Sequence, residues 1–109
     1  MIKHIVLWRL KDHAMGASKS ENAGKLKALL ETLRSTVKEI KHLEVGINTN
    51  VPGVSPHGAD VALYSEFATW NDLEAYQKHP EHLKVVGFVQ EIRLERYVVD
   101  YEIPDIVTS

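Results

Sequence analysis

The segment from Tyr76 to His82, Tyr-Gln-Lys-His-Pro-Glu-His, places a phenol and two imidazoles within seven residues. Imidazole titrates near neutral pH and can take up or release a proton, and a phenolic hydroxyl can donate a hydrogen bond. Pro80 cannot donate a backbone hydrogen bond and biases His79 away from helical angles, which predicts a junction between two helices. Titratable side chains held at such a junction are suited to proton-transfer chemistry.

The composition predicts one globular domain over residues 1–109. A net charge of −2 gives no field to attract nucleic acid or an anionic membrane. No apolar run approaches the roughly 18 residues that cross a bilayer, and the apolar start lacks a signal-peptide cleavage site. The absence of cysteine excludes disulfides, thiolate catalysis and sulfur-ligated metals. We therefore expect a cytoplasmic protein with neither a nucleic-acid nor a membrane partner.

The spacing of hydrophobic residues follows two different periods along the chain, one typical of strands and one typical of helices. Alternation predicts strands over residues 2–11, 43–50, 59–67 and 94–103. Helical spacing predicts a long helix ending near Val37 and two shorter helical pieces that meet at Pro80. Three further groups of residues complete this interpretation. Ser18 and Glu21 have capping-box spacing, Thr69 or Asn71 can cap the second helix, and Trp70 and Leu83 are expected on apolar helix faces.

The remaining segments are expected to be loops. One runs from Asp12 to Gly16, and the other, over residues 52–58, contains an exposed His57.

The order strand, helix, strand, strand, helix, strand predicts an α+β fold of the ferredoxin-like βαββαβ type. In this fold one antiparallel four-stranded sheet carries its helices on one face and leaves the other face open. This second face is apolar on the first and last predicted strands. An exposed apolar sheet face of this size marks a protein interface, so we expect a symmetric homodimer formed through the sheet faces.

Three segments together resemble the stress-responsive dimeric α/β-barrel (Dabb) family. They are the opening Lys3-His4-Ile5-Val6-Leu7-Trp8-Arg9-Leu10-Lys11, the Tyr-x-x-His-Pro-x-His segment from Tyr76 to His82, and the ending Val99-Asp100-Tyr101-Glu102. The resemblance implies a ferredoxin-like protomer, a dimeric α+β barrel, and a small cavity between sheet and helices. Functions in this family are mixed. Some members are stable stress-induced assemblies, and a plant member with a similar motif is a polyketide cyclase with a histidine base and a tyrosine.

The resemblance implies catalytic roles for His82, as a base, and for Tyr76, as a hydrogen-bond donor to a developing oxyanion. His4, His79 and Trp8 are the positions expected to contact a substrate. The structural alternative is that Tyr76 and His82 pack at the helix break with their polar atoms bonded to backbone, and that His4 is a hydrogen-bonded core residue.

Asp100 is unusual on an apolar strand, and we expect it to pair with Arg9 or Arg96 or to help close the dimer. No metal site is predicted, because Pro80 disrupts the helix that would align His79 with His82, and there is no cysteine to complete a ligand set. There is also no cofactor motif.

Three functions are compatible with these residues. The first is a homodimer that binds a small, partly apolar molecule and carries out cyclase- or isomerase-like acid/base chemistry. The second is a non-enzymatic, stable stress-related oligomer, and the third is a cofactor-independent monooxygenase on a related dimeric barrel.

Overall fold

The computed structural model describes residues 1–53 and 58–104; the expected exposure of His57 therefore lies outside the described residues. The elements within these ranges are β1 Ile2–Leu10, β2 His13–Ala14, β3 Ala17–Ser18, α1 Lys19–Thr36, β4 Ile40–Ile47, β5 Val61–Phe67, α2 Trp70–Lys78, α3 Pro80–Ile92 and β6 Arg93–Glu102. The predicted helices and long strands are therefore present, with ends shifted by up to three residues.

The start of α1 is fixed by the predicted capping box. The Ser18 hydroxyl accepts the backbone N–H of Glu21 at 3.2 Å, and the Glu21 carboxylate accepts the backbone N–H of Ser18 at the same distance. Two otherwise unsatisfied donors are thereby paired at the first turn. The segment before this cap differs from the expected loop. There β2 and β3 form a short hairpin that turns at Met15 and Gly16, both with positive φ.

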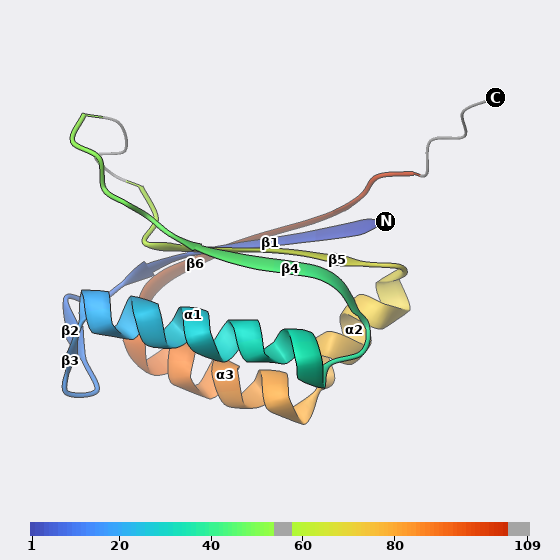
Figure 1. Cartoon of the computed structure of the whole chain (residues 1–109), viewed down its shortest axis with the longest axis horizontal. Coiled ribbons are helices and arrows are strands. Elements are labelled where there is room, and N and C mark those ends of the chain that lie inside the picture. Colours follow the sequence, from blue (N-terminus) through green and yellow to red (C-terminus); the bar gives the residue numbers. More distant parts are fainter. Residues whose placement is uncertain (54–57, 105–109) are drawn as a thin grey trace.

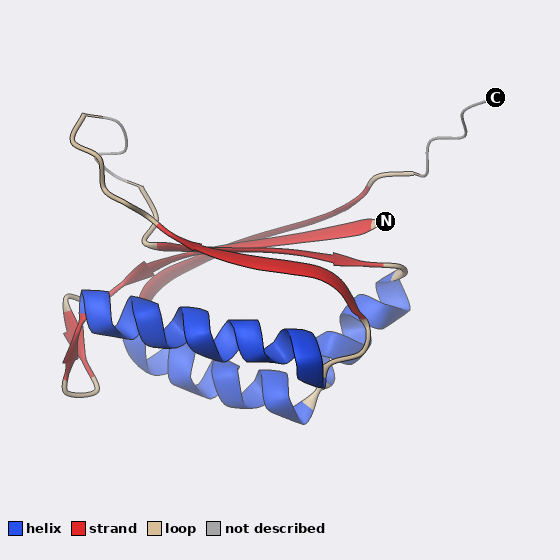
Figure 2. Cartoon of the chain, viewed as in Figure 1, coloured by secondary structure: helices blue, strands red, loops and turns tan. Residues whose placement is uncertain are grey.

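The described strands form a four-stranded antiparallel sheet in the order β4-β5-β1-β6. All three helices of the described residues lie on one face of this sheet (Figures 1 and 2). This arrangement is the ferredoxin-like α+β fold, as predicted. Because β1 occupies an inner position, its side chains lie between those of β5 and those of β6 on both faces of the sheet.

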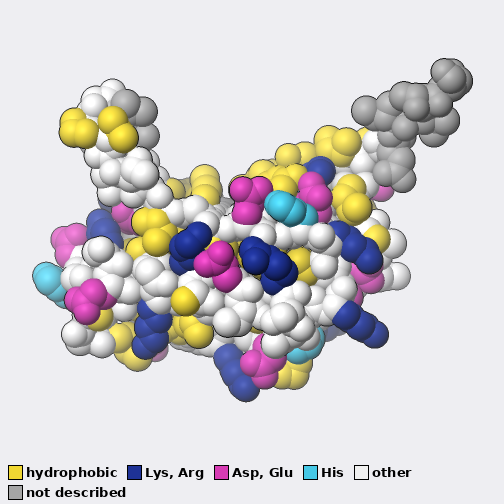
Figure 3. Space-filling view, in the orientation of Figure 1, with side chains coloured by type: hydrophobic (Ala, Val, Ile, Leu, Met, Phe, Trp, Pro, Cys, Tyr) yellow, Lys and Arg dark blue, Asp and Glu magenta, His cyan; other side chains and the backbone are white. Residues whose placement is uncertain are grey.

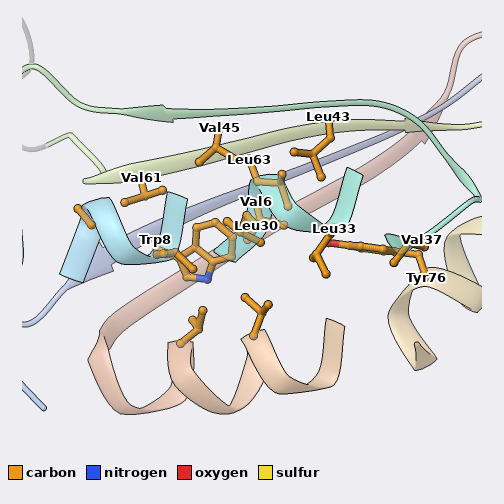
Figure 4. Packing of buried hydrophobic residues seen from close by; sticks show 14 of the residues in the cluster. Val6, Trp8, Leu30, Leu33, Val37, Leu43, Val45, Val61, Leu63 and Tyr76 are labelled. Carbon is orange, nitrogen blue, oxygen red and sulfur yellow. The ribbon is translucent and has the colours of Figure 1, made fainter. Parts of the chain in front are cut away.

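The core fills the space between the sheet and the helices (Figure 4). From β1 it takes Ile2, Val6, Trp8 and Leu10, which alternate along the strand, and from α1 it takes residues at helical spacing such as Leu26, Leu30 and Leu33. Two expectations about helix faces are wrong. Trp70 is 48% exposed at the first turn of α2, and Leu83 is 54% exposed because Val85, Val89 and Ile92 form the buried stripe of α3.

The opposite face of the sheet has no helix in the described structure. It carries Leu7, Tyr97, Val99 and Tyr101, each more than a third exposed. Yellow hydrophobic side chains lie along the upper margin of Figure 3, on the side of the sheet away from the helices. Lys3 pairs with Glu66 on this face, and the Tyr64 hydroxyl donates to the same carboxylate at 2.6 Å. We call this surface the open face.

Candidate functional site

A cavity of about 330 Å³ lies between the sheet and the helices. Its sheet-side wall comes mainly from β1, and its helical wall comes from α1, the end of α2 and α3. Most of the lining is apolar, and polar groups interrupt it at a few positions. The lining residues used below are His4, Val6, Trp8, Tyr76, His82, Val85, Val89, Arg93 and Arg96.

The junction between α2 and α3 places Tyr76 and His82 together. His79 ends α2 and begins α3 in extended conformation, and Pro80 occupies the first turn of α3. The chain reverses there, so that the rings of Tyr76 and His82 lie 4.3 Å apart between centroids and are tilted by 41°. The Tyr76 ring is also 6.0 Å from the His4 ring. Three of the predicted site residues therefore meet at one end of the cavity.

The surroundings of His82 determine which of its two ring nitrogens carries the proton. Its Nδ1 lies 3.1 Å from the backbone carbonyl oxygen of Gln77. A carbonyl oxygen only accepts hydrogen bonds, so Nδ1 carries the proton and Nε2 of the neutral ring keeps its lone pair. Burial lowers the pKa of His82 by more than the hydrogen bond to the Gln77 carbonyl raises it, and the positive charge of Arg96 acts in the same direction as burial. The side chain can therefore act as a base at neutral pH.

Tyr76 is fully buried, and its hydroxyl has no hydrogen-bond partner within the described residues. Trp8 is 5% exposed, and its indole N–H is similarly without a partner in that part of the chain. Figure 4 shows both rings reaching into the space between the sheet and α3. Burial raises the pKa of Tyr76, so its hydroxyl stays protonated and can donate. Buried donors of this kind are normally paired, and here two that lack a partner in the described chain line one cavity.

His4 is the third polar group at this end. Its Nδ1 forms a hydrogen bond with the Asp100 carboxylate, directly across the β1–β6 pair. Because a carboxylate accepts, Nδ1–H donates and Nε2 is left free. This contact corrects the expectation for Asp100, which pairs with neither Arg9 nor Arg96. Arg9 lies on the other face of the sheet and bonds Glu95 at 2.8 Å.

The remaining predicted site residue lies apart from the cavity. His79 is not among the lining residues, and its Nδ1 accepts the backbone N–H of Glu81 at 3.1 Å. It serves there as the N-terminal cap of α3. The lining also contains residues that the sequence analysis did not select, chiefly Arg93 and Arg96. The two-residue spacing of Arg96, Val98 and Asp100, which puts them on one face of β6, was the available signal that Arg96 faces the helices.

Neither a metal cluster nor a membrane span is found in the described parts of the chain. No three histidine, aspartate or glutamate side chains among those residues are placed to share a metal ion. The helices described here are also too short or too polar to cross a membrane.

The ferredoxin-like sheet and its histidine- and tyrosine-lined cavity define a small α+β domain, and sequence comparison identifies its family. The model of the Stress responsive A/B Barrel Domain (Dabb) matches residues 2–103. The chain therefore belongs to that family. A relative is the stress-response A/B barrel domain-containing protein DABB1 of Arabidopsis thaliana, which is 25% identical over 103 residues. The match covers 93% of this chain and 46% of that protein's length.

Solved structures show the same fold. A dimeric protein of unknown function with a ferredoxin-like fold from Bacteroides fragilis is 34% identical, with a TM-score of 0.78, and the match covers 94% of this chain and 95% of that one. A hydroxynitrile lyase from Passiflora edulis is 22% identical, with a TM-score of 0.76 and coverage of 98% and 96%. At that identity the second likeness is one of fold.

Proposed function

We propose that this protein binds a small, partly apolar molecule in the cavity and transfers a proton to or from it. In this proposal His82 is the base and the Tyr76 hydroxyl stabilises the oxyanion that forms when a carbon next to a carbonyl loses its proton. The observation that carries the proposal is the buried Tyr76 hydroxyl, which has no partner among the described residues and shares its cavity with the lone pair on Nε2 of His82.

The protonation states of the two residues support this division of roles. Burial disfavours the charged form of each group, so it lowers the pKa of the His82 imidazole and raises that of the Tyr76 phenol. The imidazole is thereby kept able to accept a proton and the phenol able to donate a hydrogen bond. The bonded pair of His4 and Asp100 lies beside them and can fix a polar group of the ligand.

The proposal includes a homodimer. The open face exposes Leu7, Tyr97 and Val99, and packing it against the same face of a second copy would bury them. The Bacteroides fragilis relative is described as dimeric, which supports this arrangement. The Passiflora edulis neighbour is a hydroxynitrile lyase, which is consistent with chemistry on this fold. The cavity favours a ligand-binding function over that of a purely structural oligomer, for which a filled interior is expected.

The test is proton exchange. Small phenols and aryl ketones are first screened by the shift they cause in melting temperature. Acetophenone is then incubated with the protein in D₂O, and loss of its methyl proton signal is followed by NMR. We expect exchange above the buffer rate, and a fall of about 100-fold or more in His82→Gln, since a positioned base contributes that much.

The matched control is His13→Gln, which removes an exposed imidazole from the β2–β3 hairpin. It should leave the exchange rate unchanged. Exchange no faster than in buffer, or equal rates in wild type and His82→Gln, would contradict the proposed chemistry.

A further inference from the structure

The cavity has two polar ends, and the proposed chemistry uses one of them. On the helix-facing side of the β1–β6 ladder, His4 is paired with Asp100, Val6 with Val98, and Trp8 with Arg96. Trp8 lies four residues from His4, which is about 13 Å along a strand. The histidines and Tyr76 gather at the first end. Trp8, whose indole N–H has no partner in the described chain, and the backbone of Arg96 lie at the second.

The second end carries positive charge without an internal counter-ion. Arg93 and Arg96 both line the cavity, and no aspartate or glutamate is among its described lining residues. Neither arginine forms a salt bridge or a side-chain hydrogen bond within the described chain, whereas Arg9 and Arg34 each bond a specific oxygen. The nearest candidate on the same face, Asp100, is bonded to His4.

Between the two ends the walls are apolar. Val6 lines the cavity on the sheet side and Val85 and Val89 line it on the α3 side, so this part of the cavity suits a hydrocarbon segment. A guanidinium group presents several N–H donors in a planar fork that matches a carboxylate, and the Trp8 indole supplies a further buried donor. A cationic end, an apolar middle and an acid/base end together select a ligand of one type.

We propose that the cavity takes an amphipathic carboxylic acid, with its carboxylate held by Arg96, Arg93 and the Trp8 indole N–H. Its reacting carbonyl lies at the other end of an apolar segment, beside His82 and Tyr76. This inference rests on the proposed function and names its substrate class. Arg96 is therefore a binding residue for the carboxylate, and its charge also acts on His82 and Tyr76.

Binding of a matched pair of compounds tests the carboxylate. The probes are 6-oxo-6-phenylhexanoate and its primary amide, which have nearly the same shape and differ in charge. Isothermal titration calorimetry of the full chain should show the acid binding about tenfold or more tightly than the amide, as expected for hydrogen bonds to a charged group. In Arg96→Met this preference should fall to about twofold or less, chiefly through weaker binding of the acid.

Two variants control for net charge and geometry. Lys38→Met removes one exposed positive charge outside the cavity and should keep the full preference. Arg96→Lys keeps the charge but loses the planar fork, so its preference should be intermediate. Equal affinity of wild type for acid and amide would overturn the carboxylate assignment and leave the proposed function standing. Binding of neither compound would overturn both.

Kinetic measurements distinguish the binding role of Arg96 from the proton-transfer role of His82. With the keto acid as substrate for proton exchange, Arg96→Met should raise KM about tenfold and leave kcat within twofold, because the lost contact is made equally in the ground and transition states. His82→Gln should lower kcat and keep the binding preference for the acid. A loss of kcat in Arg96→Met without a change in KM would overturn the binding role of Arg96.

Discussion

His4 and Asp100 stand directly opposite each other on β1 and β6, and the imidazole Nδ1–H donates to the carboxylate across the strand pair. The His4 side chain is 3% exposed and that of Asp100 is 28% exposed, so a buried ring is anchored by a carboxylate that still reaches solvent. The contact fixes which nitrogen of His4 faces the cavity. It also accounts for the carboxylate between Val99 and Tyr101 on β6.

Removing this anchor should destabilise the fold. Asp100→Ala leaves a buried imidazole N–H without a partner, which costs about 1–3 kcal/mol. Urea denaturation followed by circular dichroism measures this loss as a shift in the transition midpoint. Glu102→Ala, which removes an exposed carboxylate from the same strand, is the control and should change stability little. Equal stabilities of the two variants would show that the His4–Asp100 bond contributes nothing.

Two substitutions of Tyr76 should have different effects on stability while both lower activity. Tyr76→Phe removes a buried hydroxyl that bonds nothing in the described chain, so the free energy of unfolding should stay the same or rise by up to about 1 kcal/mol. Tyr76→Ala empties a fully buried aromatic site and should cost about 3–5 kcal/mol. Proton exchange should fall in both variants. A Tyr76→Phe protein that is clearly destabilised would mean that the hydroxyl has a structural partner.

Stability should depend on pH through His82. Its pKa in the folded protein lies below the ordinary value of 6.5, mainly because of burial. Between the two pKa values the unfolded chain binds more protons, so folding stability rises with pH there. The contribution of His82 is present above pH 6.5 and is lost as the pH falls through the folded-state pKa.

The check is a series of unfolding free energies between pH 5 and pH 8. His82→Gln should lose part of the decrease seen below pH 6.5 in the wild type. His13→Gln keeps His82 and should follow the wild-type curve. A His82→Gln curve identical to that of the wild type would show that burial does not shift this group.

The oligomeric state tests the open face. Val99 is 51% exposed on that face and Leu83 is 54% exposed on α3, so the two differ in position more than in exposure. Val99→Lys should convert the dimer into a monomer in light-scattering measurements coupled to gel filtration, because a charge at an apolar interface is left unpaired. Leu83→Lys should remain dimeric. A monomeric wild type, or dimeric Val99→Lys, would argue against a sheet-to-sheet dimer.

Much of the fold follows from local patterns in the sequence. Alternation on β1, the Ser18–Glu21 capping box and the break at Pro80 each have one simple structural solution, and the structure contains all three. The wrong predictions concern residues whose hydrophobicity alone was used to predict that their side chains face the core. Trp70 and Leu83 are apolar but point outward, because a helix turns by 100° per residue and its buried stripe is set by the sheet beneath it.

The site could be foreseen only in part. The short segment from Tyr76 to His82 determines its own geometry, so the meeting of these two rings follows from the helix break. The role of Asp100 depends on the register between β1 and β6, which are more than eighty residues apart in the chain. A one-residue change of that register would place Asp100 on the other face. Arg96 enters the cavity for the same reason, and no local motif indicates it.

Because side chains alternate along β6, this one strand contributes both to the open face and to the wall of the cavity. Tyr97 and Val99 lie on the side proposed to meet a second copy, while Arg96 and Asp100 lie on the side proposed to meet the ligand. A single inserted or deleted residue in this strand would exchange the two sets at once. We therefore expect natural variants to change recognition by substitution within β6 while preserving its length.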